Sequence, residues 1–445
     1  MHCLCADGFV RHTCKVSAPG LDLIVPRELA RATGRLAAAQ IFVSASLPLN
    51  ATVGAVAAKR LSGHEGLAGI SVGIAFIFSM LALFVVGSIA QNLGRRPVLL
   101  AGMSLLGFGA LICGVAIWAH SFPLLVVGTA IFGCGQGPSM LGRAAAADLY
   151  PPLLRGRGVG AVATAGAIGA VAGPLIAIAA GGGADALGIV RSAGPFLAVP
   201  VLGIVALWLI GTLRPDPRDV ASDLGRWYRT LPPLPEPPPP RPRRELMRLA
   251  PARAAITATA LVQAAMVGVM SITAVELGDS GWADWQVQLL MAAHFVGMFA
   301  LAYPVGLLAD RVGRRRTMLL ALAVCAVGSF GTAATGASPL ITPFFFLLGL
   351  GWAGCFVAGT AVMADVTSPR ERGVLTAAND FVVAGVAAVS SLSAGALLSG
   401  AGYWAVGTVF GVLLLLGVPQ LLRLQEPTVG VYAEAPAQVL AERPA

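Results

Sequence analysis

At residues 306–316 the chain reads Gly-Leu-Leu-Ala-Asp-Arg-Val-Gly-Arg-Arg-Arg, between two long apolar runs at residues 285–308 and 317–336. Two apolar segments of this length, joined by a few basic residues, are typical of membrane-spanning helices that turn at the membrane surface. Gly313 can adopt the positive φ angle that reverses the chain between them. The stretch therefore predicts a helical hairpin with its basic turn at the edge of a bilayer.

Asp310 is the unusual residue of this hairpin. It lies at the carboxyl end of the first helix, where the helix dipole is already negative and disfavours a carboxylate. Asp310 therefore needs a cationic partner or the amino terminus of another helix. Gly306, one turn earlier, would let a neighbouring backbone come close. We interpret Asp310 as part of a gate rather than as part of a ligand site.

A second, weaker copy of the hairpin begins 219 residues upstream (306 against 87). It reads Gly-Ser-Ile-Ala-Gln-Asn-Leu-Gly-Arg-Arg at residues 87–96 and again separates two apolar runs. Gln91 and Asn92 replace the acid and the arginine that follows it, so we do not expect a gating role of equal weight for this copy. Its candidate gating residues are Gly87, Gln91, Gly94 and Arg95.

The duplicated hairpin resembles the hallmark loop of the major facilitator superfamily, which lies between the second and third helices of each half. The resemblance covers roughly residues 35–424. It implies an all-α membrane protein with twelve transmembrane helices in two six-helix bundles, related by the parallel pseudo-two-fold axis known for this superfamily. The residues of the second copy that match the pattern are Gly306, Asp310, Arg311, Gly313, Arg314 and Arg315.

Composition indicates a membrane protein independently of this resemblance. Hydrophobic residues make up 57% of the chain and charged residues 11%, against about 25% charged residues in soluble domains. Most of the apolar runs reach the length of about 20 residues that a bilayer requires. We expect spans near residues 36–58, 66–90, 97–119, 123–147, 158–181, 194–213, 254–276, 286–309, 317–337, 340–364, 373–398 and 403–422.

The net charge of +9 follows from where the basic residues lie. With the amino terminus in the cytoplasm, Lys59, Arg60 and Arg191 fall in outer loops and Arg143 falls inside a span. The other 26 of the 30 basic residues then face the cytoplasm. This positive-inside distribution predicts a multi-pass protein of the cell membrane with both termini in the cytoplasm, and it explains the basic charge without a nucleic-acid partner.

The predicted spans divide the chain into five segments: two six-helix bundles, a central loop between them and a tail at each end. The segment between the two bundles contains a proline run that favours an extended conformation over a helix, so we expect a spacer rather than a folded domain. A ligand of an SH3-type domain is conceivable there, but a spacer on anionic headgroups is favoured. The segments are an amino-terminal cytoplasmic tail (1–34), a first six-helix bundle (35–213), a central cytoplasmic loop (214–253), a second six-helix bundle (254–424) and a carboxy-terminal cytoplasmic tail (425–445).

No metal or cofactor is predicted. The first residues lack the apolar core of a cleaved signal peptide, so we expect the first helix to serve as the insertion signal. Cysteine and histidine residues near the start could suggest a metal cluster, but their spacing matches no zinc pattern, and a disordered tail or a start site further downstream is favoured. These residues are His2, Cys3, Cys5, His12 and Cys14.

In this superfamily the first, fourth, seventh and tenth helices line a central cavity, which implies candidate substrate contacts in this chain. Polar groups inside a membrane are costly and therefore few. Hydrogen bonding between helices is an equally good interpretation of each isolated amide. Because the candidates are neutral, they argue mildly against a strongly charged substrate. The candidates are Gln40, Asn50, Gln136, Gln263 and Trp352.

Two charged residues are predicted inside spans, one in each half. Asp380 lies seven residues after Gly373, about 10 Å into its helix, and Arg143 lies five residues before Asp148, roughly 7–8 Å from the same surface. Asp380 is our candidate for proton coupling. We also interpret Arg143 and Asp380 as an ion pair between the halves that breaks when the protein opens inward; the alternative is that each bonds within its own half.

Two further features lie in the fifth and eighth spans. Gly169, Gly173 and Pro174 partly resemble the antiporter motif of the superfamily, whose later glycines are absent here. His294 lies midway along the eighth span, where it could relay protons, although a neutral histidine bonded to a neighbour is favoured.

These features predict a secondary active transporter that moves a small organic molecule by alternating access, coupled to protons and working as a monomer. Export is slightly favoured over uptake of a sugar or similar nutrient. A non-transporting membrane sensor on the same fold is the alternative of another class, and a channel is a third. No nucleotide-binding loop, metal-binding helix motif or nucleophile elbow is present, so we predict no enzymatic activity.

Overall fold

The computed structural model describes residues 25–151, 154–228, 241–368 and 371–424, and the backbone of a short antiparallel strand pair, β1 (Ser17–Ala18) and β2 (Leu21–Asp22). The cysteines and histidines near the amino terminus that could suggest a metal cluster lie outside the described residues, and so does the tail at 425–445. Within the described part, twelve helices are long and apolar enough to cross a membrane. The prediction of a twelve-span helical protein is therefore confirmed.

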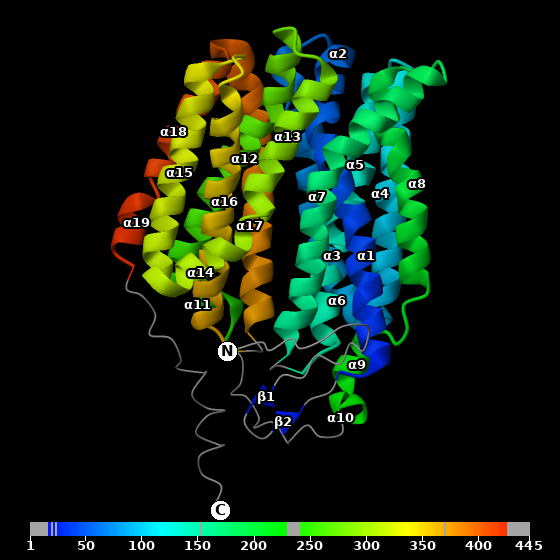
Figure 1. The fold of residues 1–445 in the computed structure, drawn as a ribbon, viewed down its shortest axis with the longest axis vertical. Coiled ribbons are helices and arrows are strands. Elements are labelled where there is room, and N and C mark those ends of the chain that lie inside the picture. Colours follow the sequence, from blue (N-terminus) through cyan, green and yellow to red (C-terminus); the bar gives the residue numbers. More distant parts are fainter. Residues whose placement is uncertain are drawn as a thin grey trace, which may run out of the picture.

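The first half consists of six spans, which Figure 1 shows in blue to green. Its first span is bent into three consecutive helical segments, and its fourth span is divided in two. The elements are α1 (Arg27–Leu49), η1 (Asn50–Gly54) and α2 (Ala55–Ser62), then η2 (Glu65–Leu67), α3 (Ile70–Leu93), α4 (Arg95–Trp118), α5 (Phe122–Ser139), α6 (Gly142–Asp148), α7 (Arg155–Ala186), η3 (Arg191–Ala193) and α8 (Gly194–Gly211).

The second half repeats this arrangement in yellow-green to red (Figure 1). Short helices of the central segment, α9 (Pro217–Ser222), α10 (Leu224–Trp227) and α11 (Arg243–Leu246), precede it. The spans are α12 (Ala250–Asp279), α13 (Asp284–Phe299) with α14 (Ala302–Val312), α15 (Arg314–Thr335), α16 (Ile341–Asp365), α17 (Arg372–Ala401), and α18 (Tyr403–Leu415) with α19 (Val418–Leu422).

The π-helix η1 interrupts the first span beside a proline. Pro48 lacks the N–H group that an α-helix needs, so the regular ladder is broken there. The hydroxyl of Thr52 donates to the carbonyl of Pro48 over 3.0 Å. Segments of π-helix are frequent at functional sites because they re-aim side chains. Here the π-helix brings Thr52 toward the second half of the molecule.

Each half has its own apolar core, and the core of the second half continues into part of the first half. The first-half residues that it includes are Ala51, Ala55, Ala68, Val72 and, midway along α7, Ala170. We call the end at Gly94 and Gly313 the hairpin end and the other end the opposite end. The shared core lies toward the opposite end.

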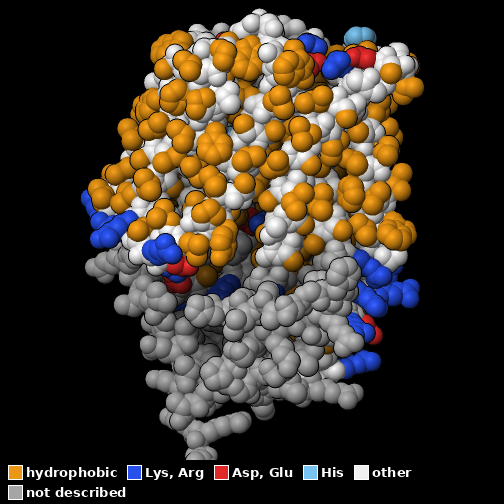
Figure 2. Space-filling view, viewed as in Figure 1, with side chains coloured by type: hydrophobic (Ala, Val, Ile, Leu, Met, Phe, Trp, Pro, Cys, Tyr) orange, Lys and Arg blue, Asp and Glu red, His pale blue; other side chains and the backbone are white. Residues whose placement is uncertain are grey.

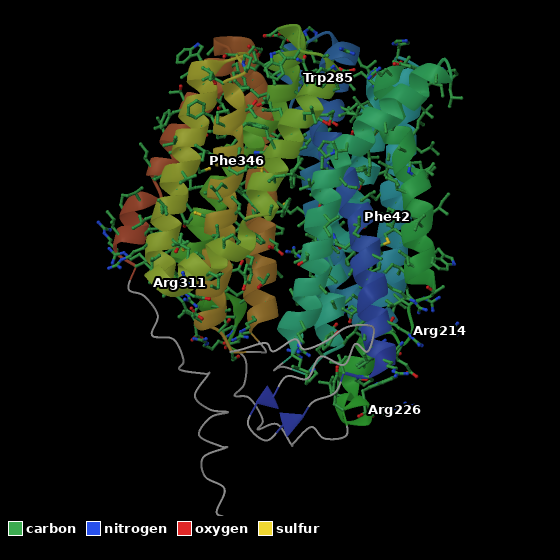
Figure 3. The ribbon with its side chains drawn as sticks, in the orientation of Figure 1. Phe42, Arg214, Arg226, Trp285, Arg311 and Phe346 are labelled. Carbon is green, nitrogen blue, oxygen red and sulfur yellow. The ribbon has the colours of Figure 1, made fainter. Side chains whose placement is uncertain are left out.

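Charged and aromatic residues mark the two ends differently. Lysine and arginine side chains gather near the hairpin end, while apolar side chains cover the flanks of the bundle (Figure 2). Arg214, Arg226 and Arg311 lie at the hairpin end and Trp285 lies at the opposite end (Figure 3). The exposed apolar flank between them fits the hydrocarbon region of a membrane.

Candidate functional site

The second hairpin contains a chain of charged contacts. Gly313 adopts a φ angle of 98° and reverses the chain between α14 and α15. Arg314 Nη1 lies 3.1 Å from Asp310 Oδ1, and Arg314 Nε lies 3.4 Å from Asp365 Oδ2. The cation beside Asp310 therefore comes from the helix that follows it, and the same guanidinium reaches the end of α16.

The first hairpin has a matching contact at the equivalent position. Arg95 Nε lies 2.8 Å from Asp148 Oδ2, and this ion pair corresponds to the longer Arg314–Asp365 contact of the second half. Gly94 has a φ angle of 95°, close to that of Gly313. Gly87 and Gln91 lie in the last turns of α3, and their side chains are outside the described part.

The two hairpins differ in what caps the following helix. Asp216, from the central segment, accepts hydrogen bonds from the backbone N–H groups of Arg95 and Arg96 over 3.1 and 3.0 Å. A carboxylate at a helix amino terminus is stabilised by the helix dipole and satisfies N–H groups that have no partner within the helix. The first hairpin is thus fixed by the central segment. We did not predict this contact, because Asp216 lies 121 residues from Arg95 in the sequence.

The other end of the central segment is fixed to the second half. Arg241 donates to Glu371 through its backbone N–H, Nε and Nη2, each over 2.9 Å, and through Nη2 to the carbonyl of Val366 over 3.0 Å. The Glu371 side chain is 3% exposed and also accepts from the backbone N–H of Ser368. These hydrogen bonds, first of all those from Arg241, hold the pKa of Glu371 far below its usual range.

We expect Glu371→Gln to lower the stability of the protein by about 2–3 kcal/mol, because Arg241 then loses a charged, bidentate acceptor. The pKa of Glu371 is depressed in the folded state, so its contribution is present above the carboxyl's ordinary pKa and is lost as pH falls toward the folded value. Thermal melting of purified protein at pH 7 and pH 4 would measure this. Equal melting temperatures of the variant and the wild type at pH 7 would contradict it.

The opposite end is closed by tight helix packing between the halves. A Cβ atom built on Gly69 would lie 1.8 Å from the backbone oxygen of Ser391, and one built on Gly395 would lie 2.6 Å from the oxygen of Gly66. Ser391 Oγ also donates to the carbonyl of Gly69 over 2.8 Å. Glycine is required at these positions because only it lets the start of α3 and the later part of α17 approach so closely.

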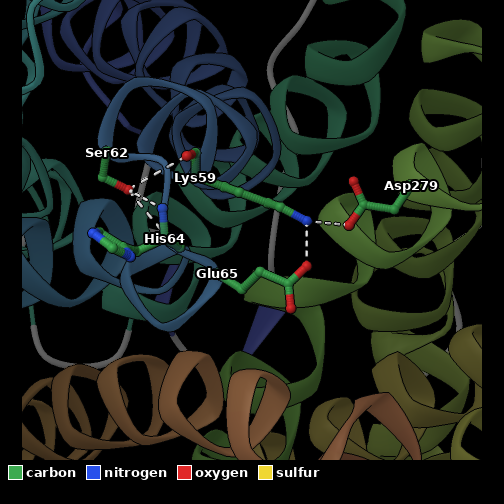
Figure 4. Close-up of polar contacts among 5 residues, drawn as sticks. All are labelled: Lys59, Ser62, His64, Glu65 and Asp279. Atoms are coloured by element: carbon green, nitrogen blue, oxygen red, sulfur yellow. Dashed lines mark hydrogen bonds and ion pairs between the residues drawn. The ribbon is translucent and has the colours of Figure 1, made fainter.

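Ion pairs and a hydrogen bond reinforce this closure. Lys59 Nζ contacts Asp279 of the second half and lies 2.5 Å from Glu65 Oε1, which Figure 4 shows in close-up. Arg191 Nε lies 3.6 Å from Asp284 Oδ2. Gln288 Nε2 donates to Thr52 Oγ1 of the π-helix over 3.3 Å. These pairs could not be predicted from the sequence, because isolated charged residues near the ends of spans form no pattern.

Toward the hairpin end the halves are separated. Figure 2 shows the surface hollowed between them there, with charged side chains visible in the hollow. Arg143 lies on α6 of the first half and Asp380 on α17 of the second. Their charges interact, but they form no ion pair in the described part of the chain. Asn379 Nδ2 is 3.5 Å from Asp380 Oδ1. The closed opposite end and the hollow define an inward-facing arrangement if the hairpin end is cytoplasmic.

The predicted cavity residues fall into two groups. Gln263 and Trp352 are brought together: Trp352 Nε1 donates to Gln263 Oε1 over 2.7 Å. The others bond within the first half or not at all. Gln40 Nε2 donates to Ser44 Oγ, Asn50 Oδ1 accepts from Ser71 Oγ, and the half-buried Gln136 makes no side-chain hydrogen bond to the described residues.

The antiporter-like residues of the fifth span pack against the first span. A Cβ atom on Gly169 would lie 2.1 Å from the backbone oxygen of Ile41, and one on Gly173 would lie 2.6 Å from that of Ala45. Pro174 follows inside the same helix, α7. The geometry gives these residues a packing function within the first half.

His294 is fully buried between α13 and α16. Its Nδ1 lies 2.8 Å from the carbonyl oxygen of Phe345 and therefore carries the hydrogen. A hydrogen bond to a neighbour is what we favoured from the sequence; the neutral state of the ring stays a prediction. No group of three or more histidine, cysteine or acidic residues in the described part could hold a metal ion.

Two six-helix bundles, closed together at one end and parted at the other around a few polar groups, define a membrane transporter of the alternating-access class. Comparison with known proteins agrees with this class. The sequence profile of the Major Facilitator Superfamily matches residues 36–283 and 254–440. The chain belongs to this superfamily and is a secondary transporter.

Similar proteins support the same assignment. The MFS-type transporter YdeG of Bacillus subtilis (strain 168) is 30% identical, covering 85% of this chain and 88% of the relative. The riboflavin transporter RfnT of Brucella anthropi is 27% identical, covering 90% of this chain and 97% of the relative. The inward-open, partially occluded structure of the Escherichia coli xylose transporter XylE shares the fold, with a TM-score of 0.68, 13% identity, and coverage of 91% of this chain and 99% of that one.

Proposed function

We propose that the protein is a proton-coupled exporter of a small organic molecule in the cell membrane. The observation that carries this proposal is the placement of two opposite charges, Arg143 on α6 and Asp380 on α17, within spans of the two halves and toward the end where the halves part. A carboxylate inside a span is costly and is rarely kept without a function. Release of Asp380 from Arg143 as the hairpin end opens would change its affinity for a proton, which links protonation to the conformational cycle.

Orientation follows from charge. The hairpin end carries the arginines of both hairpins and of the central segment, so the positive-inside rule supports a cytoplasmic hairpin end and cytoplasmic termini. Trp118, Trp285 and Trp404 are exposed near the opposite end, where indole rings anchor helices at the membrane interface. One chain holds both halves of the pathway, which supports function as a monomer.

The substrate is proposed to be small, organic and without strong charge. The candidate cavity residues are four amides and an indole, which bind through hydrogen bonds rather than through charge. The relative RfnT is a riboflavin transporter, an example of a small organic substrate at 27% identity. Uptake of a sugar remains the second candidate. The helices α9, α10 and α11 are too short to form the folded domain that a membrane sensor would carry.

The test uses everted membrane vesicles and riboflavin as a fluorescent probe. We expect an acid-inside pH gradient to drive riboflavin into vesicles that contain the wild-type protein, and Asp380→Asn to abolish this accumulation while leaving downhill exchange. Asp219→Asn, an exposed acid on α9, is the matched control and should transport normally. Accumulation in right-side-out vesicles with acid outside would instead establish uptake, and unchanged gradient-driven transport in Asp380→Asn would exclude Asp380 as the coupling acid.

A further inference from the structure

The second half carries a set of stacked aromatic rings between α13 and α16. Trp352 and Phe356 lie one turn apart on α16, with ring centroids 4.8 Å apart and ring planes inclined by only 11°. Phe299 of α13 meets Trp352 edge to face at 6.0 Å and 71°, and Phe295 stacks on Phe299 at 6.4 Å and 14°. We call these four rings the aromatic ladder. Their mutual packing fixes the planes of the rings before any ligand arrives.

The side-chain amide of Gln263 accepts a hydrogen bond from the Trp352 indole, and the two N–H groups of that amide have no acceptor among the described residues. The indole N–H of Trp352 can only donate, so the oxygen of Gln263 must face it, and the amide nitrogen must point away. In the described part of the chain, that nitrogen makes no hydrogen bond. Gln263, which is 6% exposed, therefore keeps two N–H groups near the edge of the stacked indole.

The ladder joins α13 to α16, and Gln263 reaches it from α12. Of these helices, α12 and α13 contact η1, α2 and α7 of the first half. Trp352, Phe356 and Phe299 are half-buried, whereas lipid-facing aromatic residues such as Trp404 are exposed and core residues such as Phe345 are fully buried. Partial burial is what a surface between two separable halves requires.

We propose that the aromatic ladder with Gln263 binds the flat face of an uncharged heteroaromatic compound that carries carbonyl or ring-nitrogen acceptors. This inference rests on the proposed function and names the substrate class. The parallel Trp352–Phe356 pair offers a π surface to a third ring, and the Gln263 N–H groups donate to an acceptor at its edge. A sugar can place its C–H groups against one indole, but it has no π system with which to stack as a third ring, so it gains less from the ladder.

The test measures binding to detergent-purified protein without any pH gradient. The probes are three flat heterocycles (caffeine, lumichrome and quinoxaline), with D-glucose as the non-aromatic comparison, and equilibrium dialysis gives the dissociation constants. We expect saturable binding of at least one flat probe and none of glucose. Trp352→Leu should weaken that binding about ten-fold or more, and Trp352→Phe, which keeps a ring, should weaken it less.

Two further variants separate the contacts. Gln263→Leu should weaken binding of acceptor-bearing probes about ten-fold and should leave the binding of anthracene, a flat hydrocarbon, unchanged. Trp285→Leu removes an exposed indole at the opposite end, and it should change neither the binding of acceptor-bearing probes nor the binding of anthracene. Binding of glucose but of no flat probe, or equal binding by Trp352→Leu and the wild type, would overturn the proposal. The binding assay uses no pH gradient, so a failure of proton coupling in the vesicle assay would not affect the binding result. A failure of probe binding would likewise not affect the test of proton coupling.

Discussion

Gly69→Ala should lower the initial rate of transport at least ten-fold while the protein still folds. The new methyl group would lie 1.8 Å from the carbonyl oxygen of Ser391, and neither backbone can move aside as a flexible side chain would. Overpacking of this kind costs about 1–3 kcal/mol, and a cost borne only by the closed state moves the population toward the open one. The variant should therefore rest with its opposite end open.

Accessibility of a cysteine placed at Val56 would measure that shift. Val56 lines a pocket between the halves near the opposite end, so a membrane-impermeant maleimide added from that side should label Val56→Cys faster when Gly69→Ala is present. Gly400→Ala is the matched control, because a Cβ atom there has nothing within 4 Å. Unchanged labelling together with unchanged transport would show that α3 and α17 separate at no stage of the cycle.

Arg143→Asp should reduce downhill exchange to near background, and Asp380→Arg added to it should restore a measurable part by returning the balance between the two conformations. The single change places two acids opposite each other across the halves, and like charges at that depth disfavour closure of the hairpin end. The double exchange returns opposite charges to the same two positions. Transport in proteoliposomes, measured for both single variants and the double variant, gives the coupling energy between the sites.

A control for this pair lies in the first hairpin. Arg95 contacts Asp148 within one half, so exchanging those two charges should change stability more than it changes the balance between conformations. If the effects of Arg143→Asp and Asp380→Arg simply add, with no recovery in the double variant, the two residues act separately. The function of Asp380 would then be assessed only from the effect of Asp380→Asn on gradient-driven transport.

The sequence predicts the fold well because membrane helices are encoded locally. About 20 consecutive apolar residues suffice to indicate a span, and the two hairpins indicate the duplication. The gating assignments for Asp310 and Gln91 stay predictions. The structure adds that Arg314 is the cation beside Asp310, four residues further along the chain, which is the kind of contact that helical spacing can suggest.

Contacts between distant segments could not be read in the same way. Asp216 reaches the first hairpin, Arg241 reaches Glu371 from 130 residues away, and Lys59 reaches Asp279 from 220 residues away. None of these residues belongs to a repeat or a periodic pattern. The cavity candidates show a related difficulty: a span is recognised from composition, but the face that Gln40 or Asn50 presents depends on how the spans pack.

The contact between Gly69 and Ser391 is a point about which α17 would rotate as the hairpin end opens and closes. Ser391 touches Gly69 near the opposite end, and Arg372 begins the same helix nineteen residues earlier (391 against 372), about 28 Å away at about 1.5 Å per residue. Rotation about that contact by roughly 10° would move the hairpin end of α17 by about 5 Å while the glycines themselves scarcely slide. The helix extends nineteen residues from Ser391 toward the hairpin end but only ten toward Ala401 at the opposite end (401 against 391). The same rotation would therefore move the hairpin end of α17 about twice as far as the opposite end.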